Sequence, residues 1–202
     1  MANQLILVRH GELEERYRGR YVGRTDAPLS ARGRRQALAL AGPLAGLPEA
    51  VFWVSPLARA RETAAIALGA DRPCPIDGDL REIDFGAWEG MSFGEIVAAD
   101  PSAVANWAEM DDGFAFPGGE AVADFRRRIA EAAQRIAADP ARTVVVLAHG
   151  GVIRFLICDL LGLGHRRHLI FDISPASISE IRIDAGRGVL TRLNDRHHLE
   201  GC

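Results

Sequence analysis

The sequence predicts an α/β fold, a three-layer sandwich in which helices cover both faces of a mostly parallel sheet. Four short apolar runs are strand candidates: Leu5–Val8, Val51–Val54, Thr143–Leu147 and Ile178–Ile183. The first three runs lack an alternation of apolar and polar residues, which is typical of strands covered on both faces of a parallel sheet. Helical patterns lie between these runs, and this order of elements favours the α/β class.

Two helices are expected in the first third of the chain. Ser30 can cap a helix that runs to about Leu47. Ser55 and Pro56 predict the start of a second helix, with serine as its N-cap and proline at its first helical position.

The rest of the chain predicts two more helices, an edge hairpin and an inserted cap. Apolar residues recur at helical spacing from Val122 to Ile136 and predict a helix there. A second, buried helix is predicted for Gly151–Leu161. The stretch from Ile178 to Leu193 contains a turn and predicts a hairpin at the sheet edge. Residues 84–119 have glycine, proline and tryptophan but little periodicity, so we expect a cap inserted over the sheet. Because no linker or repeat divides the chain, we expect residues 1–202 to form one domain.

Composition narrows the class of protein. The chain has 202 residues, 48% of them apolar and 25% charged, and a net charge of -3. This balance gives no reason to expect nucleic acid or an anionic membrane as a partner. No apolar stretch approaches the roughly 18 residues that span a bilayer, and three cysteines are too few for a disulfide framework. We therefore expect a cytoplasmic protein; its edge hairpin could pair in a homodimer or end free.

Two of the predicted strands end in the same way. The first runs into Arg9 and His10, and the third runs into His149 and Gly150. In open α/β sheets, ligands bind in the crevice at the carboxyl ends of the strands, so neighbouring strands would bring both imidazoles into one crevice. Glycine after each histidine lets the backbone come close to a ligand.

A helix start follows the second strand and adds positive charge. The free N–H groups and the dipole of a helix N-terminus favour an anion. Arg59 and Arg61 lie about 200° apart on that helix, so only one of them can face the crevice. Two histidines with Arg9 and one helix-borne arginine suit a dianionic phosphate, and a neutral imidazole is a competent nucleophile toward phosphorus.

Other interpretations of the same residues are weaker. A lone histidine after a strand is more often a structural polar residue than a catalyst, but two such histidines and an arginine favour function. A metal site is the main chemical rival. Arg9 and Arg59 would repel a cation, so we expect no metal and no cofactor.

Five segments, in this order, resemble the motifs of the histidine phosphatase superfamily, also called the phosphoglycerate-mutase-like family: Leu7–Glu12, Gly23–Ser30, Ser55–Ala64, Leu80–Gly90 and Ala148–Gly151. The resemblance covers most of the chain. Several motifs in the right order at plausible spacing are far more specific than any one of them.

The resemblance implies a role for each matching residue. His10 would attack phosphorus as a neutral imidazole, with its Nδ1–H held by a backbone carbonyl. The phosphoryl oxygens would be bound by Arg9, Arg59, His149 and Gly150. Glu82 would protonate the leaving group and then take a proton from water.

Two further residues are expected to contact the substrate. They are Gly23, in the second motif, and Arg16, in a basic stretch that also contains Arg18, Arg20 and Arg24. That stretch could serve a peptide or an extended anion, although such a run of charges is usually a solvated face.

The chain resembles the phosphatases of the family more than its mutases. Cofactor-dependent mutases are generally longer, and they have Ser and Asn where this chain has Leu13 and Arg16. Residues 84–90 look most like those of α-ribazole phosphatase, which suggests a small phosphorylated metabolite, such as α-ribazole phosphate or a sugar phosphate, as substrate. The alternatives are a cofactor-dependent phosphoglycerate mutase, a non-catalytic relative that binds a phospho-ligand, and a phosphoprotein phosphatase.

Aromatic residues of the expected cap also allow two interpretations. They could line the pocket for a ring-bearing leaving group or form the small core of the cap, and the second is favoured for at least two of them. They are Trp88, Trp107, Phe114 and Phe116.

Overall fold

A mixed five-stranded sheet forms the centre of the computed structural model, which describes residues 2–47, 49–69, 71–108, 113–184 and 187–201. The strand order is β2-β3-β1-β4-β5. β2, β3 and β1 are parallel, whereas β4 runs antiparallel to β1 and β5 antiparallel to β4. The strands are β1 (Gln4–Arg9), β2 (Val51–Val54), β3 (Thr143–Ala148), β4 (Ile178–Asp184) and β5 (Arg187–Asp195).

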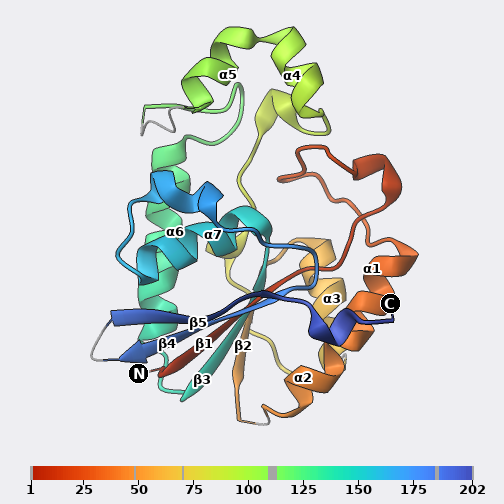
Figure 1. Cartoon of the computed structure of the whole chain (residues 1–202), viewed down its shortest axis with the longest axis vertical. Coiled ribbons are helices and arrows are strands. Elements are labelled where there is room, and N and C mark those ends of the chain that lie inside the picture. Colours follow the sequence, from red (N-terminus) through yellow and green to blue (C-terminus); the bar gives the residue numbers. More distant parts are fainter. Residues whose placement is uncertain (1, 48, 70, 109–112, 185–186, 202) are drawn as a thin grey trace.

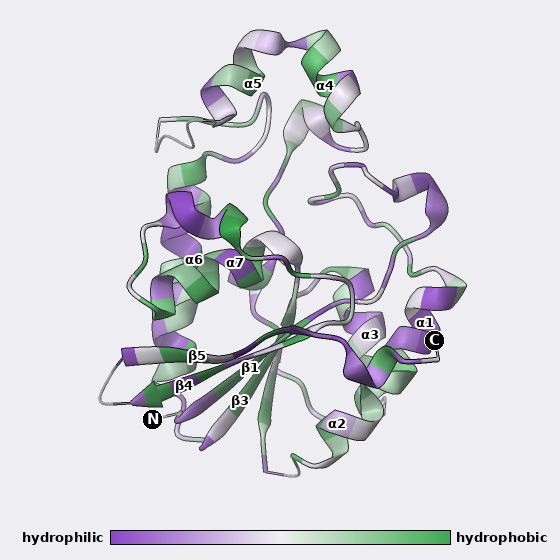
Figure 2. Ribbon diagram, viewed as in Figure 1, coloured by the Kyte–Doolittle hydropathy of each residue, from purple (hydrophilic) through white to green (hydrophobic). Residues whose placement is uncertain are grey.

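Helices cover both faces of this sheet (Figure 1). One face carries α1 (Ala31–Ala39), α2 (Ala41–Ala45) and α3 (Ala58–Leu68), and the other carries α6 (Val122–Ala137) and α7 (Gly150–Leu160). Alternate strand residues point to opposite faces, so Leu5 and Leu7 join one core and Ile6 and Val8 join the other. Figure 2 shows hydrophobic stretches along β1 and β3, between the helices. The predicted α/β sandwich is confirmed.

The predicted edge hairpin is confirmed by the antiparallel pairing of β4 with β5. Residues 185 and 186 of its turn lie outside the described residues. Within the described residues, no helix is both long enough and apolar enough to cross a bilayer.

The first predicted helix is divided in two. Ser30 caps α1 as expected, because its hydroxyl accepts the Gly33 N–H at 2.9 Å. The helix ends at Ala39 and a new one begins at Ala41. Pro43 has no N–H to donate to the Ala39 carbonyl, so the regular helix cannot continue through this point.

The predicted start of the second helix is wrong by two residues. α3 begins at Ala58 with Leu57 as its N-cap, and no side chain caps it. The hydroxyl of Ser55 accepts the Leu57 N–H at 3.4 Å, but its shorter contact is with His149 Nε2, at 2.7 Å. This contact joins it to a residue 94 positions away and not to the first turn of α3.

The described residues of the segment 84–119 lie beyond the carboxyl end of the sheet (Figure 1). Among the described residues, this segment holds α4 (Phe93–Ala99), α5 (Pro101–Ala108) and a short 3-10 helix, η3 (Gly86–Trp88). Trp88 packs edge-to-face on Trp107 and on Phe116, with ring centroids 6.0 and 5.3 Å apart. Trp88, Phe114 and Phe116 are buried, so these aromatic residues form the core of the segment.

The remaining 3-10 helices are short: η1 (Glu15–Tyr17), η2 (Gly78–Leu80), η4 (His165–Ile170) and η5 (His197–Leu199). η4 follows α7, and residues 171–177 then lead from η4 into β4.

Candidate active site

The two histidines meet at the carboxyl end of the sheet. β1 and β3 are parallel neighbours, and the last pair in their register is Arg9 with Ala148. His10 and His149 follow this pair directly, and their ring centroids lie 5.1 Å apart at an interplanar angle of 58°. The expectation that the two strands bring both imidazoles together is confirmed.

His10 is held in a single tautomer. Its Nδ1 lies 2.8 Å from the Gly11 carbonyl oxygen, which can only accept a hydrogen bond. Nδ1 therefore carries the proton, and the lone pair is on Nε2. Burial, followed by the positive charges of Arg59 and Arg9, lowers the pKa of His10 well below its usual value. The imidazole is therefore neutral at physiological pH.

His149 is held in the opposite tautomer. Arg59 Nε always carries a proton and donates to His149 Nδ1 at 3.2 Å. The proton of the neutral ring is then on Nε2, which donates to Ser55 Oγ at 2.7 Å. Burial and the charge of Arg59 also lower the pKa of His149 well below its usual value.

Arg59 also binds the loop of residues 22–25. Its side chain is fully buried, whereas Arg61 is exposed. Arg59 Nη1 donates to the Thr25 carbonyl at 2.9 Å, and Nη2 donates to the Gly23 carbonyl at 2.7 Å. Burial lowers the pKa of Arg59, and the carboxylates of Glu82 and Glu89 oppose this effect.

The N–H groups of the same loop are bound by Glu89. This carboxylate accepts the Arg24 N–H at 2.8 Å, the Gly23 N–H at 3.1 Å and the Thr25 hydroxyl at 2.6 Å. A Cβ at Gly23 would lie 1.9 Å from the Ile83 carbonyl oxygen, so only glycine fits there. The sequence reasoning missed Glu89, although it lies in the Leu80–Gly90 motif.

Arg9 is the last residue of β1 and directly precedes His10. Its Nη1 donates to the Ile173 carbonyl, and its Nε is buried with no partner among the described residues. Burial lowers the pKa of Arg9 to about 10, so the guanidinium remains charged at neutral pH. Gly150 lies against it, because a Cβ there would be 3.4 Å from Arg9 Cζ.

Glu82 lies at the first turn of α7. Its Oε2 accepts the Gly151 N–H at 2.9 Å, and its Oε1 accepts the Ile83 N–H at 3.1 Å. The side chain is buried. A Cβ at Gly151 would lie only 2.4 Å from Glu82 Oε1, so this glycine makes room for the carboxylate.

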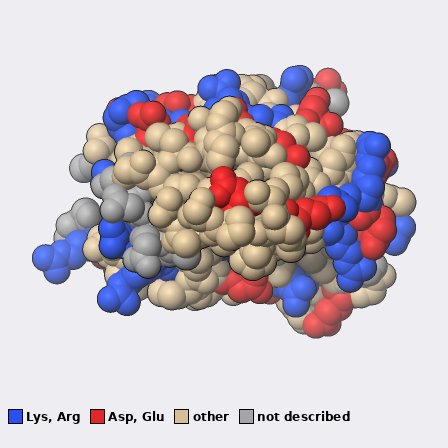
Figure 3. All heavy atoms as spheres, turned by 90° about the horizontal axis from the view of Figure 1, so that it is seen from above, with Lys and Arg blue, Asp and Glu red and all other residues tan. Residues whose placement is uncertain are grey.

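The basic stretch is neutralised by acidic partners. Arg16 pairs with Glu14 at 3.1 Å, and its side chain is 66% exposed. The other three arginines of the stretch also have acidic partners: Arg18 with Glu15, Arg20 with Glu95 and Arg24 with Glu120. Figure 3 shows positive and negative side chains mixed around the rim of the face seen from above, with mostly uncharged residues in its middle.

Among the residues that the structure describes, no group of three or more His, Cys, Asp or Glu side chains could hold a metal ion.

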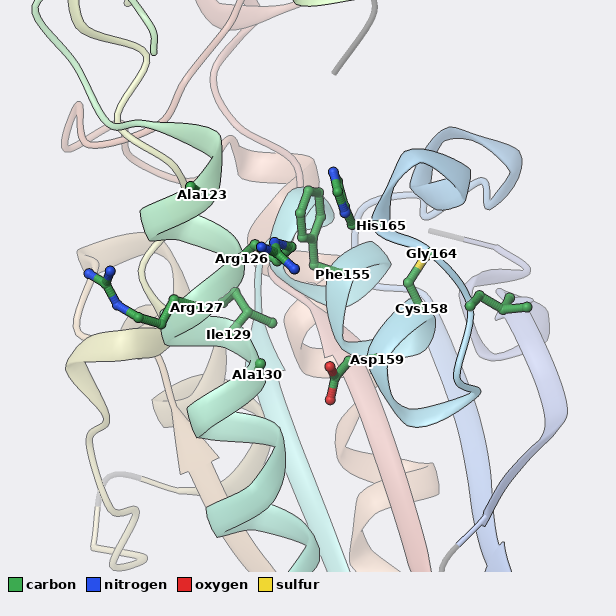
Figure 4. Close-up of a pocket in the computed structure, with 11 residues that line it drawn as sticks. Ala123, Arg126, Arg127, Ile129, Ala130, Phe155, Cys158, Asp159, Gly164 and His165 are labelled. Atoms are coloured by element: carbon green, nitrogen blue, oxygen red, sulfur yellow. The ribbon is translucent and has the colours of Figure 1, made fainter. Parts of the chain in front are cut away.

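A cavity of about 460 Å³ lies between α6, α7 and the start of η4 (Figure 4). Its lining includes Arg126, Phe155, Cys158, Asp159 and His165, and none of the site residues described above.

The cluster can therefore bind a compact anion beside a nucleophilic nitrogen. The charges of Arg59 and Arg9 act on the His10 imidazole, and the Glu82 carboxylate lies at the start of α7. The sequence matches the model of the histidine phosphatase superfamily (branch 1) over residues 5–196, and the chain belongs to this family.

Its relatives support phosphatase activity. The chain is 35% identical to phosphoserine phosphatase 1 of Hydrogenobacter thermophilus over 198 residues, which cover 97% of this chain and 94% of that protein. It is 32% identical to adenosylcobalamin/α-ribazole phosphatase of Salmonella typhimurium over 195 residues, 96% of each. The crystal structure of a putative α-ribazole-5′-P phosphatase from Escherichia coli matches with a TM-score of 0.87 and 30% identity, covering 97% of this chain and 98% of that one.

Proposed function

We propose that this chain hydrolyses phosphomonoesters through a covalent phosphohistidine on His10. The observation that carries the proposal is the hydrogen bond from His10 Nδ1 to the Gly11 carbonyl, 2.8 Å long. It leaves the lone pair on Nε2, and burial together with the charges of Arg59 and Arg9 keeps the imidazole neutral. A neutral imidazole is the nucleophilic form.

In the first step, His10 Nε2 attacks phosphorus as the ester P–O bond breaks. The protonated carboxyl of Glu82 gives its proton to the leaving alkoxide, which departs as an alcohol. In the second step, Glu82 takes a proton from water as the water oxygen attacks phosphorus and the N–P bond breaks. Orthophosphate leaves, and His10 and Glu82 return to their starting states.

The transferred group is stabilised by charge at fixed positions. Arg9 offers its buried Nε–H, which has no partner among the described residues, and Arg59 retains one N–H on Nη1 beyond its bond to Thr25. Gly150 allows the group to approach the start of α7, where helix N–H groups favour an anion. Preorganised donors of this kind stabilise the charge that develops in a phosphoryl-transfer transition state.

We propose a small phosphorylated metabolite as the substrate. The relatives named above act on α-ribazole phosphate or phosphoserine, so these compounds and sugar phosphates are the first candidates. The paired arginines of the basic stretch offer little free charge to an extended anionic chain. Contacts of Gly23 and Arg16 with the substrate stay predictions.

The first experiment is hydrolysis of para-nitrophenyl phosphate by the wild type and by His10→Ala, with and without a chelator. We expect turnover that the chelator leaves unchanged and that disappears in the variant. His197→Ala is the matched control, because that imidazole is exposed on η5. Full activity of His10→Ala, or no turnover by folded wild type, would refute the proposal.

A second assay separates the alternative functions. Release of orthophosphate from a panel containing α-ribazole phosphate, phosphoserine and sugar phosphates would support a phosphatase and rank its substrates. Interconversion of phosphoglycerates that depends on bisphosphoglycerate would instead identify a mutase. Binding of phosphate without any turnover would identify a non-catalytic relative.

A further inference from the structure

The loop of residues 171–177 lies directly against the end of β1. The Ala176 N–H donates to the His10 carbonyl at 3.0 Å, and the Arg9 N–H donates to the Ser177 carbonyl at 3.2 Å. The side chain of Arg9 also reaches this loop, where Nη1 donates to the Ile173 carbonyl. The loop therefore contacts both the backbone around the nucleophile and the guanidinium beside it.

The middle of this loop is held by one side chain from the end of β5. Asn194 Oδ1 accepts the Ser174 N–H at 2.7 Å, and Asn194 Nδ2 donates to Asp172 Oδ2 at 2.9 Å. The Asn194 N–H donates to Ser179 Oγ on β4 at 3.1 Å, which fixes the asparagine itself. The residues on both sides of Ile173 are thus bound to Asn194, so the carbonyl that holds Arg9 lies between two anchored neighbours.

The same asparagine orients a charge near Arg9. Burial has the largest effect on the pKa of Arg9 and lowers it; the carboxylate of Asp172 raises this pKa, with a smaller effect than that of Glu82. Loss of the Asn194 side chain would release both this carboxylate and the Ser174 N–H. Asn194 has a φ of 51°, a conformation that asparagine tolerates better than most residues and that glycine adopts freely.

We propose that Asn194 is a positioning residue for the phosphoryl site, acting through the 172–174 backbone on the guanidinium of Arg9. This inference rests on the proposed function, because it assigns Arg9 the binding of the phosphoryl group. It also gives the C-terminal segment a role in the site, although β5 is an edge strand and does not reach the histidines.

The test is Asn194→Gly, which removes the side chain and keeps the backbone conformation. We expect kcat/KM for para-nitrophenyl phosphate to fall by about tenfold, and the Kd for orthophosphate, measured by calorimetry, to rise by about the same factor. That factor corresponds to about 1.4 kcal/mol. Thr191→Gly is the matched control, because Thr191 is exposed on the same strand and its hydroxyl donates to the Glu180 carbonyl, not to the loop; it should change neither value.

A double-mutant cycle with Arg9→Ala decides between positioning and general stabilisation. If Asn194 acts through Arg9, Asn194→Gly causes no further loss of orthophosphate affinity in a protein that already carries Arg9→Ala. Equal losses in both backgrounds would overturn the inference. Should Asn194→Gly fail to fold, Asn194→Asp replaces it: it keeps the acceptor for Ser174, loses the donor to Asp172, and should weaken orthophosphate binding several-fold.

The outcomes for the two proposals are distinguishable. Wild-type turnover with an additive cycle overturns the role of Asn194 and leaves the phosphatase proposal standing. Orthophosphate binding with the expected cycle, but no turnover of any ester, supports the role of Asn194 and overturns the phosphatase proposal. A wild type that neither binds orthophosphate nor hydrolyses esters overturns both.

Discussion

Gly151→Ala should reduce proton donation by Glu82 without unfolding the protein. The new Cβ would lie 2.4 Å from Glu82 Oε1, and real Cβ atoms essentially never come closer than 3.0 Å to such an atom. The carboxylate must therefore move by about 0.6 Å or more. Because a misplacement of about 1 Å can cost about 100-fold in rate, we expect kcat to fall between about 10- and 100-fold, or about 1.4–2.7 kcal/mol.

The assay compares two substrates with different leaving groups. An alkyl ester such as β-glycerophosphate needs a proton donor, whereas para-nitrophenolate leaves readily without one. We expect the large loss of kcat on the alkyl ester and a much smaller one on para-nitrophenyl phosphate. Unchanged kcat on both substrates, or equal losses on both, would refute the role given to Glu82.

The matched control is Gly94→Ala. Gly94 is the second residue of α4, as Gly151 is the second residue of α7, and nothing lies within 4 Å of a Cβ built there. Both substitutions raise helix propensity, so neither should lower Tm through the helix itself. Only Gly151→Ala should change turnover.

Three other predictions concern the groups that hold the site. The depressed pKa values of His10 and His149 mean that the unfolded chain binds more protons below about pH 6.5, so the free energy of unfolding should fall as the pH drops below this value. Thermal melts from pH 8 to pH 5 test this, and His10→Ala should flatten the dependence. Ser55→Ala leaves the buried His149 Nε2–H without its acceptor and should cost about 1–3 kcal/mol in urea unfolding. Glu89→Gln turns an amide group toward the N–H donors of the 23–25 loop and should raise KM. The control is Glu62→Gln, which changes the ion pair of Glu62 on α3 with Arg34 and should leave KM unchanged.

Local sequence features were sufficient to predict the centre of the fold. Two strands were predicted from continuous apolar runs, Leu5–Val8 and Thr143–Leu147. Such runs are expected where a strand is buried on both faces of a sheet. Their common ending in histidine also predicted the meeting of His10 and His149, because parallel neighbours bring their carboxyl ends to one edge.

The contacts that hold the site residues in place could not be predicted from local sequence. Ser55 follows a strand and precedes a helix, so its local sequence predicts an N-cap, yet its shorter contact is with a residue 94 positions away. Glu89 and Asn194 act on backbone groups 64 to 66 and 20 residues distant. Backbone N–H and C=O groups are the same at every residue, so no residue pattern shows which of them a side chain will bind.

The measurement that tests the central claim most directly is detection of the phosphoryl group on His10 during turnover. The enzyme would be quenched in alkali, which preserves phosphohistidine, and digested with trypsin. Cleavage after Arg9 and Arg16 releases the peptide His-Gly-Glu-Leu-Glu-Glu-Arg, in which His10 is the only histidine. We expect this peptide to carry one phosphoryl group in the wild type during turnover. Sustained turnover with the peptide unmodified and the phosphoryl group on His149, or on no residue at all, would contradict the account.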